Sequence, residues 1–140
     1  MSFTIVADSC CDLPTVLHSA SYFRSVPLTI HVAGEDFVDE SLNTELLLLA
    51  MERSQEASHT SCPSPADYLN AYRAAEGDIY VITLSALLSG SHNSAWQAMH
   101  LFLEEQPDRN IYVFNSCSAS AGEVALARKV AELAESGLPF

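Results

Sequence analysis

Residues 79–96 contain the sequence IYVITLSALLSGSHNSAW, which passes from a strand pattern to a helix pattern. Ile79–Leu84 is an apolar, β-branched run of strand length, and an amphipathic stretch follows from Ser94 until Pro107 ends it. Between them, Leu88–Ser94 carries small hydroxyl residues around Gly90. A strand that leads through such a segment into a helix presents unpaired backbone N–H groups, which attract a carboxylate or a phosphate. Ordinary helix capping by serine explains this segment alone equally well.

Strand and helix patterns alternate along the rest of the chain. Strands are predicted at Phe3–Ala7, Ser25–His31, Ile79–Leu84 and Asn110–Phe114. Helices are predicted around Leu17 and at Asn43–Arg53, Pro65–Glu76, Ser94–Glu105 and Ala119–Glu135, the third of them opened by the capping box Ser64–Asp67. Gly34–Ser41 is expected to be a solvated connection. The pattern predicts one α/β domain over residues 1–140, a mostly parallel open sheet of about four strands with helices on both faces.

The composition narrows the function classes. Six Lys and Arg stand against eighteen Asp and Glu, for a net charge of −12, which argues against binding to nucleic acid or to an anionic membrane surface. No apolar run approaches the roughly 20 residues of a membrane span, and no basic segment precedes the first strand, so neither a transmembrane segment nor a signal peptide is expected. The cysteines (Cys10, Cys11, Cys62 and Cys117) form no C-x-x-C pair. Reduced thiols, no metal, no cofactor and a cytoplasmic location are predicted.

Small polar residues follow three of the predicted strands. They are Asp8 and Ser9; Ser85 with Ser89, Gly90 and Ser91; and Asn115 with Ser116, Ser118 and Ser120. In open parallel sheets, ligands bind beyond the carboxyl ends of the strands. A fourth polar group, Thr60–Ser64, lies on the predicted loop before a helix.

Groups able to transfer a proton are scarce among these residues. The candidates are Asp8, Asp12, His59 and His92. Each also has a structural interpretation: Asp12 would cap the first helix, Asp8 would hold a turn, and the histidines would lie on loops. Trp96 and Met99 are expected in the core because of their helical spacing.

The sequence lacks the specific motifs of common catalytic and nucleotide-binding sites. It contains no G-x-S-x-G elbow, no phosphate-binding G-x-x-x-x-G-K loop and no G-x-G-x-x-G. Cys11 and Cys117 are thiols without an activating partner that the sequence reveals. The site is therefore expected to hold a ligand rather than to transform it.

Taken in order, these segments resemble the amino-terminal lobe of the DegV family of bacterial fatty-acid-binding proteins. The matching segments are Asp8-Ser9, Asp12-Leu13-Pro14, Val26-Pro27-Leu28, Thr60–Ser64, Leu84-Ser85, Leu88–Ser91, Ser94-Ala95, Asn115-Ser116, Ser118, Ser120 and Gly122. Each motif is weak by itself, but together they cover nearly the whole chain.

The resemblance implies that the chain binds a long-chain fatty acid and is not itself an enzyme. Thr60 and Ser89 would bind the carboxylate, assisted by Ser61, Gly90, Ser91 and helix N-terminal amides. Supporting roles would fall to Asp8, Ser9, Asn115 and Ser116. Some relatives present the bound acid to a separate fatty acid kinase, which makes such a kinase the expected partner.

The sequence departs from the family pattern at three positions and in length. Cys62 stands where the family usually has Gln, Ser91 where it usually has Thr, and Asn115 where Asp is common, so details of hydrogen bonding should differ. Relatives usually continue into a second lobe that closes over the ligand, whereas this chain ends at Phe140. An exposed apolar face and a tendency to form a homodimer are therefore expected.

Two other function classes stay open at this stage. One is a small hydrolase or phosphatase that uses Asp8 or a cysteine thiolate. The other is an interaction module whose acidic surface docks a basic partner.

Overall fold

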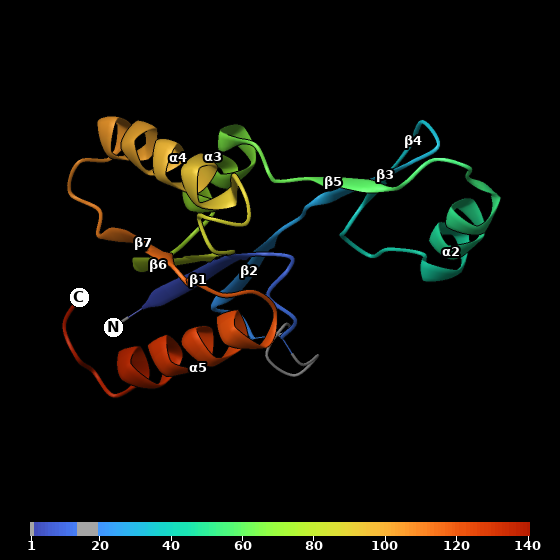
Figure 1. Ribbon diagram of the computed structural model, residues 1–140. Helices are drawn as coiled ribbons and strands as arrows, with labels where there is room; N and C mark the ends of the chain where they lie inside the picture. Colours follow the sequence, from blue (N-terminus) through green and yellow to red (C-terminus); the bar gives the residue numbers. More distant parts are fainter. Residues whose placement is uncertain (1, 14–19) are drawn as a thin grey trace.

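The structure, a computed structural model, describes residues 2–13 and 20–140. Its centre is a parallel sheet with the strand order β2-β1-β6-β7 (Figure 1). The strands are β1 (Phe3–Asp8), β2 (Phe23–Val26), β6 (Asp78–Thr83) and β7 (Ile111–Asn115). Val6 of β1 pairs with Val81 of β6, and both side chains are fully buried. The two most buried strands thus occupy the middle of the sheet, where both faces are covered.

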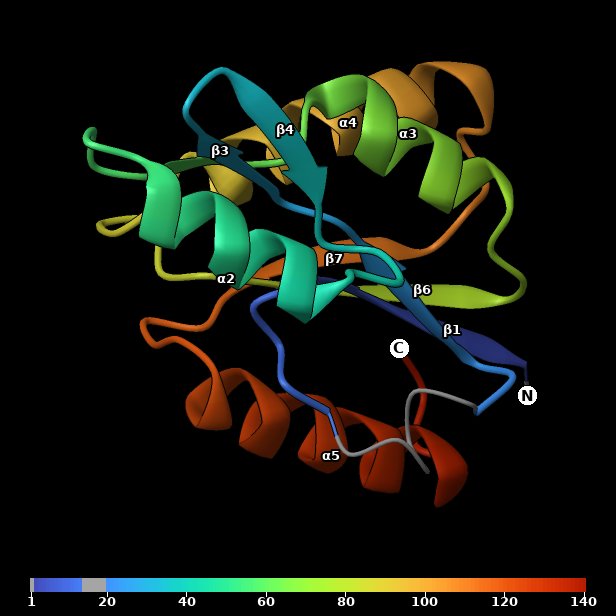
Figure 2. The same ribbon diagram turned by 90° about the vertical axis from the view of Figure 1, so that its right-hand side faces the viewer.

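Helices cover both faces of this sheet. They are α3 (Pro65–Arg73) and α4 (Ser91–Glu105) on one face and α5 (Ala121–Glu135) on the other (Figure 1, Figure 2). Tyr72 and Phe102 meet edge to face in the core between the sheet and the first two helices. Ile82 and Ala127 belong to the second core, under α5. The α/β architecture predicted from the sequence is confirmed.

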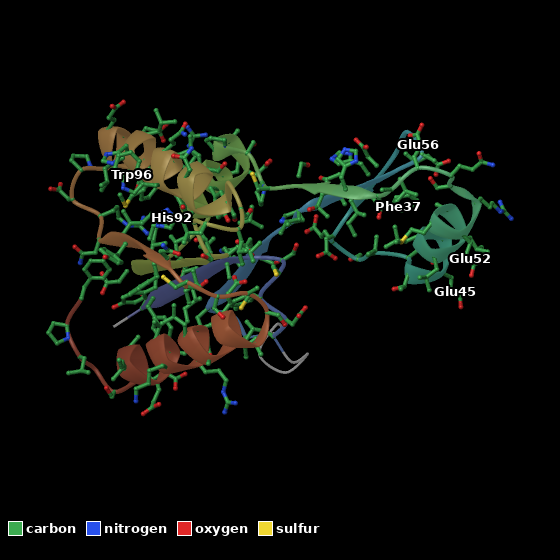
Figure 3. The ribbon with its side chains drawn as sticks, viewed as in Figure 1. Phe37, Glu45, Glu52, Glu56, His92 and Trp96 are labelled. Carbon is green, nitrogen blue, oxygen red and sulfur yellow. The ribbon has the colours of Figure 1, made fainter. Side chains whose placement is uncertain are left out.

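A second, smaller sheet extends from one end of the parallel sheet, and we call it and its helix the arm (Figure 1). The arm consists of the antiparallel strands β4 (Glu35–Val38), β3 (Thr29–Val32) and β5 (His59–Ser61), in that order, and of α2 (Thr44–Arg53). Phe37 lies on the sheet face toward α2 (Figure 3), where it lines a hollow of about 290 Å³ together with Leu46 and Leu49.

Two predictions for residues 25–41 are wrong. The predicted strand Ser25–His31 is two strands, because Pro27, which cannot donate a backbone hydrogen bond, separates β2 from β3. The predicted solvated connection Gly34–Ser41 contains β4, which forms a hairpin with β3. Ala33 and Gly34 both have positive φ, at 50° and 83°, as a two-residue type I′ hairpin turn requires.

The strand β5 was not predicted either, because Thr60 and Ser61 were expected on a loop. The remaining described helices and strands agree with the predicted ones to within a few residues. The helix predicted around Leu17 lies outside the described residues. Met99 packs against the core as expected, but Trp96 is 48% exposed and packs on His100 (Figure 3). Within the described residues, no helix is long and apolar enough to cross a membrane.

Candidate functional site

The polar segments that follow β1, β6 and β7 meet at one edge of the parallel sheet. Parallel strands bring their carboxyl ends to the same edge, and the register aligns Ala7 with Ile82 and Thr83 with Asn115. The backbone N–H of Ser85 donates to the carbonyl of Ser118 at 2.9 Å, which joins the segment after β6 to the segment after β7. The edge predicted from the sequence is thus formed by three converging segments.

Asp8, the last residue of β1, is fully buried at this edge. Its Oδ2 accepts the backbone N–H of Leu84 at 2.9 Å and the hydroxyl of Ser91 at 2.5 Å. The Ser91 hydroxyl also meets the Tyr68 hydroxyl at 2.6 Å. Asp8 therefore connects the end of β6 to the start of α4, and its carboxylate is enclosed by protein rather than open to a substrate.

Glu123, in the first turn of α5, is a second fully buried carboxyl group. Burial, followed by the neighbouring Asp8 carboxyl group, raises the pKa of Glu123 to about 8. Nothing in the local sequence around Glu123 distinguishes it from an ordinary helical glutamate, so sequence reasoning missed it.

The loop between β6 and α4 carries Ser89 and is held by its own turn and by β7. Both Leu88 and Ser89 donate backbone N–H groups to the Ser85 carbonyl. Asn115 Oδ1 accepts the N–H groups of Ala86 and Cys117, at 3.1 Å each. Asn115 thereby acts as a support for this loop.

The N-terminus of α4 is the one that the sequence singled out as an anion site. Gly90 is its N-cap residue and makes no side-chain capping hydrogen bond. The Ser89 hydroxyl oxygen accepts the N–H of Ser91 at 3.2 Å. The first turn of α4 therefore presents N–H groups and the positive end of the helix dipole at this edge.

The Thr60–Ser64 segment lies against this helix start, although it comes from the arm. Thr60 and Ser61 are in β5 rather than in a loop, and Ser64 caps α3 through a capping box with Asp67. A Cβ added at Gly90 would lie only 3.0 Å from Cys62 Sγ. The structure thus brings the two segments proposed for carboxylate binding side by side, and the absence of a side chain at Gly90 permits this approach.

Ser61 belongs to a polar row on the arm that sequence reasoning missed. His31 Nδ1–H donates to Asp36 Oδ1 at 2.6 Å, and His31 Nε2 shares a hydrogen bond of 2.9 Å with Ser61 Oγ. His59 stacks on His31 with a centroid distance of 4.7 Å. The order Ser–His–Asp is that of hydrolytic triads, but triads function in water-excluded pockets, and the Asp36 side chain is 67% exposed. We assign the row to holding β5 against β3.

The remaining predicted residues have structural partners. The Ser9 hydroxyl accepts the N–H of Leu28 at 3.0 Å, and its own N–H donates to Val26. The Ser116 hydroxyl donates to the Ser118 carbonyl at 3.1 Å. Asp12 accepts the hydroxyl of Ser120 at 2.6 Å, and the helix that it was expected to cap lies outside the described residues. His59 is on β5 rather than on a loop, and His92 is in the first turn of α4 (Figure 3).

The geometry disfavours the hydrolase and phosphatase alternative. Burial raises the pKa of the Cys11 thiol to about 12, and the negative charges of Glu123 and Asp8 add to the effect. Burial likewise raises the pKa of Cys10, so neither thiol is activated as a nucleophile. Among the described residues, no group of three or more His, Cys, Asp or Glu side chains is arranged to hold a metal ion.

Comparison with known proteins gives consistent matches. A family model described as "Uncharacterised protein, DegV family" matches residues 2–140. A DegV domain-containing protein of Streptococcus pneumoniae is 44% identical over 144 residues, covering 100% of this chain and 50% of the relative. A DegV family crystal structure from Ruminococcus gnavus with vaccenic acid has a TM-score of 0.94 at 40% identity, covering 100% of this chain and 51% of the other.

A further solved structure is the Streptococcus pneumoniae fatty acid kinase B3 protein loaded with linoleic acid. It has a TM-score of 0.90 at 44% identity, over 100% of this chain and 50% of the other. The chain thus spans about half the length of the relatives that it matches.

Proposed function

The chain belongs to the DegV family, and we propose that it binds a long-chain fatty acid whose carboxylate lies between Thr60 and Ser89. The observation that carries the proposal is the close approach of Cys62, which follows Thr60 and Ser61, to Gly90 at the N-terminus of α4. Similar chains hold vaccenic acid and linoleic acid, which supports a ligand of this class.

Neutral donors would bind the carboxylate in this arrangement. Thr60 and Ser89 supply hydroxyls, and the first turn of α4 supplies backbone N–H groups. Ser61 and Ser91 act indirectly, because their hydroxyls are engaged by His31 and by Asp8. Gly90 leaves room for Cys62. Asp8, Ser9, Asn115 and Ser116 hold the surrounding segments, as their hydrogen bonds indicate.

The acyl chain would cover apolar side chains beside the carboxylate site. Leu87 and Leu88, which directly precede Ser89, are 96% and 71% exposed. Burial of an acyl chain contributes about 0.8 kcal/mol per methylene, whereas a charge-assisted hydrogen bond contributes about 1.5–3 kcal/mol. We therefore expect the tail to dominate the affinity and the hydroxyls to fix the orientation of the carboxylate.

The chain would act as a carrier rather than as an enzyme. One similar protein is the fatty acid kinase B3 protein, which supports a role in presenting the bound carboxylate to a separate kinase. We place the carrier in the cytoplasm, because its four cysteines are free thiols.

Substitution of the two hydroxyl residues tests the proposal. Thr60→Val and Ser89→Ala should each weaken binding of linoleate by about tenfold, because each removes one hydrogen bond to a charged group. Thr44→Val and Ser58→Ala on the arm are matched controls that should bind normally. The measurement is a fluorescent fatty acid displacement titration, with circular dichroism to confirm folding. Normal affinity in both site variants would contradict the assigned roles.

A ligand retained during purification can be identified directly. Native mass spectrometry followed by organic extraction should yield a long-chain fatty acid in a one-to-one ratio with the chain. A chain that is free of acid, and stays so after incubation with linoleate, would contradict fatty acid binding by these residues.

A further inference from the structure

We propose that Asp8 and Glu123 share one proton, and that this carboxyl pair positions the Leu84–Ser91 loop, which carries Ser89. The effect on ligand binding rests on the proposed function, whereas the shared proton is a property of the fold. The two parts can therefore be tested separately.

A single oxygen of Asp8 holds both ends of the loop. Oδ2 accepts the N–H of Leu84, the first residue after β6, and the hydroxyl of Ser91, the first residue of α4. The other Asp8 oxygen, Oδ1, faces no hydrogen-bond donor although it is buried. The position of Ser89 thus depends on a carboxylate in which only one of the two oxygens accepts hydrogen bonds.

The carboxyl group of Glu123 is also buried without a hydrogen-bond partner. Both of its carboxyl oxygens are buried without a hydrogen-bond partner of normal geometry, and its residue is 0% exposed. No Lys or Arg within the described residues forms an ion pair with Asp8 or with Glu123. Two ionised carboxylates without a cation would repel strongly in this buried environment. One proton between them removes the repulsion and supplies the missing donor.

Glu123 is the member that carries the proton. Asp8 Oδ2 already accepts two hydrogen bonds, whereas neither carboxyl oxygen of Glu123 accepts one. A protonated Glu123 can donate to the unpaired Asp8 Oδ1. The pKa of about 8 that burial and Asp8 give to Glu123 agrees with this assignment.

The groups packed around Asp8 and Glu123 do not offset the rise in the pKa of Glu123. Cys10, Cys11 and Asp12 follow β1 and are neutral or negative, and Tyr68 of α3 reaches the pair only through Ser91. The Cys10 side chain and the Ser120 backbone oppose the rise in the Glu123 pKa more weakly than burial and Asp8 promote it.

The proton that Glu123 carries determines how the stability of the folded chain depends on pH. The folded chain holds it up to about pH 8, whereas an unfolded chain releases it near the ordinary glutamate value of 4.5. The folded state therefore binds more protons in this window, and its stability falls as the pH rises from about 4.5 to about 8. Above this range the pair is doubly charged, and the loop loses its fixed position.

The experiment compares the full chain with Glu123→Gln, Asp8→Asn and the control Glu135→Gln, an exposed glutamate on the same helix. Infrared spectroscopy at neutral pH should show a protonated carboxylic acid band that is absent in Glu123→Gln and present in Glu135→Gln. Thermal unfolding between about pH 5 and pH 8 should show a decreasing midpoint in the wild type and a nearly constant one in Glu123→Gln, because the amide keeps its donor.

Linoleate titration tests the positioning role. Wild-type affinity should fall about tenfold when the pH rises above the Glu123 transition, whereas Glu123→Gln should keep its affinity. Asp8→Asn should lose affinity at every pH, and Glu123→Gln gives an independent test if Asp8→Asn fails to fold. Absence of the acid band, or equal pH dependence of stability in wild type and Glu123→Gln, would overturn the shared proton.

Equal pH dependence of linoleate affinity in these two proteins would overturn the positioning role. A wild type that shows the acid band but binds no linoleate would reject the proposed function alone.

Discussion

At the residue scale, Gly90 decides how closely the arm approaches the parallel sheet domain. Its φ of −71° is accessible to any residue, so backbone freedom does not explain the glycine. Limited space explains the glycine, because an added Cβ would lie 3.0 Å from Cys62 Sγ, closer than an ordinary van der Waals contact. A side chain at this position would therefore require Cys62 to shift by a few tenths of an ångström.

Gly90→Ala should displace the Thr60–Cys62 segment and weaken linoleate binding severalfold, with a loss of about 1 kcal/mol in stability from overpacking. The double variant Gly90→Ala/Cys62→Ala should recover most of the affinity, because it removes the sulfur that the new methyl group meets. Fluorescent displacement and urea unfolding measure the two effects against Cys62→Ala as the reference. If the double variant binds no better than Gly90→Ala, contact with Cys62 is not the cause.

At the element scale, α3 begins shortly after the Thr60–Cys62 segment, which we propose to lie at the carboxylate site, and its start fixes where that segment ends. The Ser64 hydroxyl oxygen accepts the N–H of Asp67 at 3.3 Å, and Asp67 Oδ2 accepts the N–H of Ser64 at 2.8 Å. Pro65 occupies the first helical position, where its missing N–H costs nothing. This helix start is defined by local sequence alone.

Ser64→Ala should lower the free energy of unfolding by about 1 kcal/mol, because the first turn of α3 loses its side-chain acceptor. Urea unfolding at equilibrium measures the change. Ser136→Ala, at the exposed end of α5, is a control that should alter stability less. An unchanged unfolding midpoint in Ser64→Ala would show that the capping box contributes nothing in water.

At the scale of the whole molecule, the arm leaves an apolar helix surface exposed. On α2, Leu46, Leu48, Leu49 and Met51 are each between 43% and 56% exposed. The acidic residues Glu45 and Glu52 lie on the same helix, at the opposite end of the molecule from Trp96 (Figure 3). Leu46 and Leu49 line the hollow beside Phe37, whereas helical spacing places Leu48 and Met51 on another side of α2. Exposed apolar residues of this number are typical of surfaces that another molecule covers.

The chain should self-associate at high concentration, and more strongly at high salt, because a net charge of −12 opposes association until salt screens it. Leu48→Glu/Met51→Glu should shift the equilibrium to the monomer, while Glu45→Gln on the same helix should not. Sedimentation velocity over a range of concentrations measures the distribution. A strictly monomeric wild type at all concentrations and salt levels would refute the homodimer expected from the sequence.

The sequence by itself determined the parallel sheet, its helices and the edge where polar residues gather. Ile79–Leu84 and the capping box at Ser64 show why: strand periodicity, proline and caps act over a few neighbouring residues. The hairpin turn at Ala33 and Gly34 was equally local, yet it was missed because alanine seldom adopts positive φ.

Only the tertiary structure decided which distant groups meet. Asp8 and Glu123 lie 115 positions apart in the chain, and so a buried carboxyl pair leaves no local pattern. The approach of Cys62 to Gly90 and the row of Ser61, His31 and Asp36 likewise depend on how the arm is placed. Propensity and periodicity describe neighbours along the chain, whereas burial and charge depend on neighbours in space.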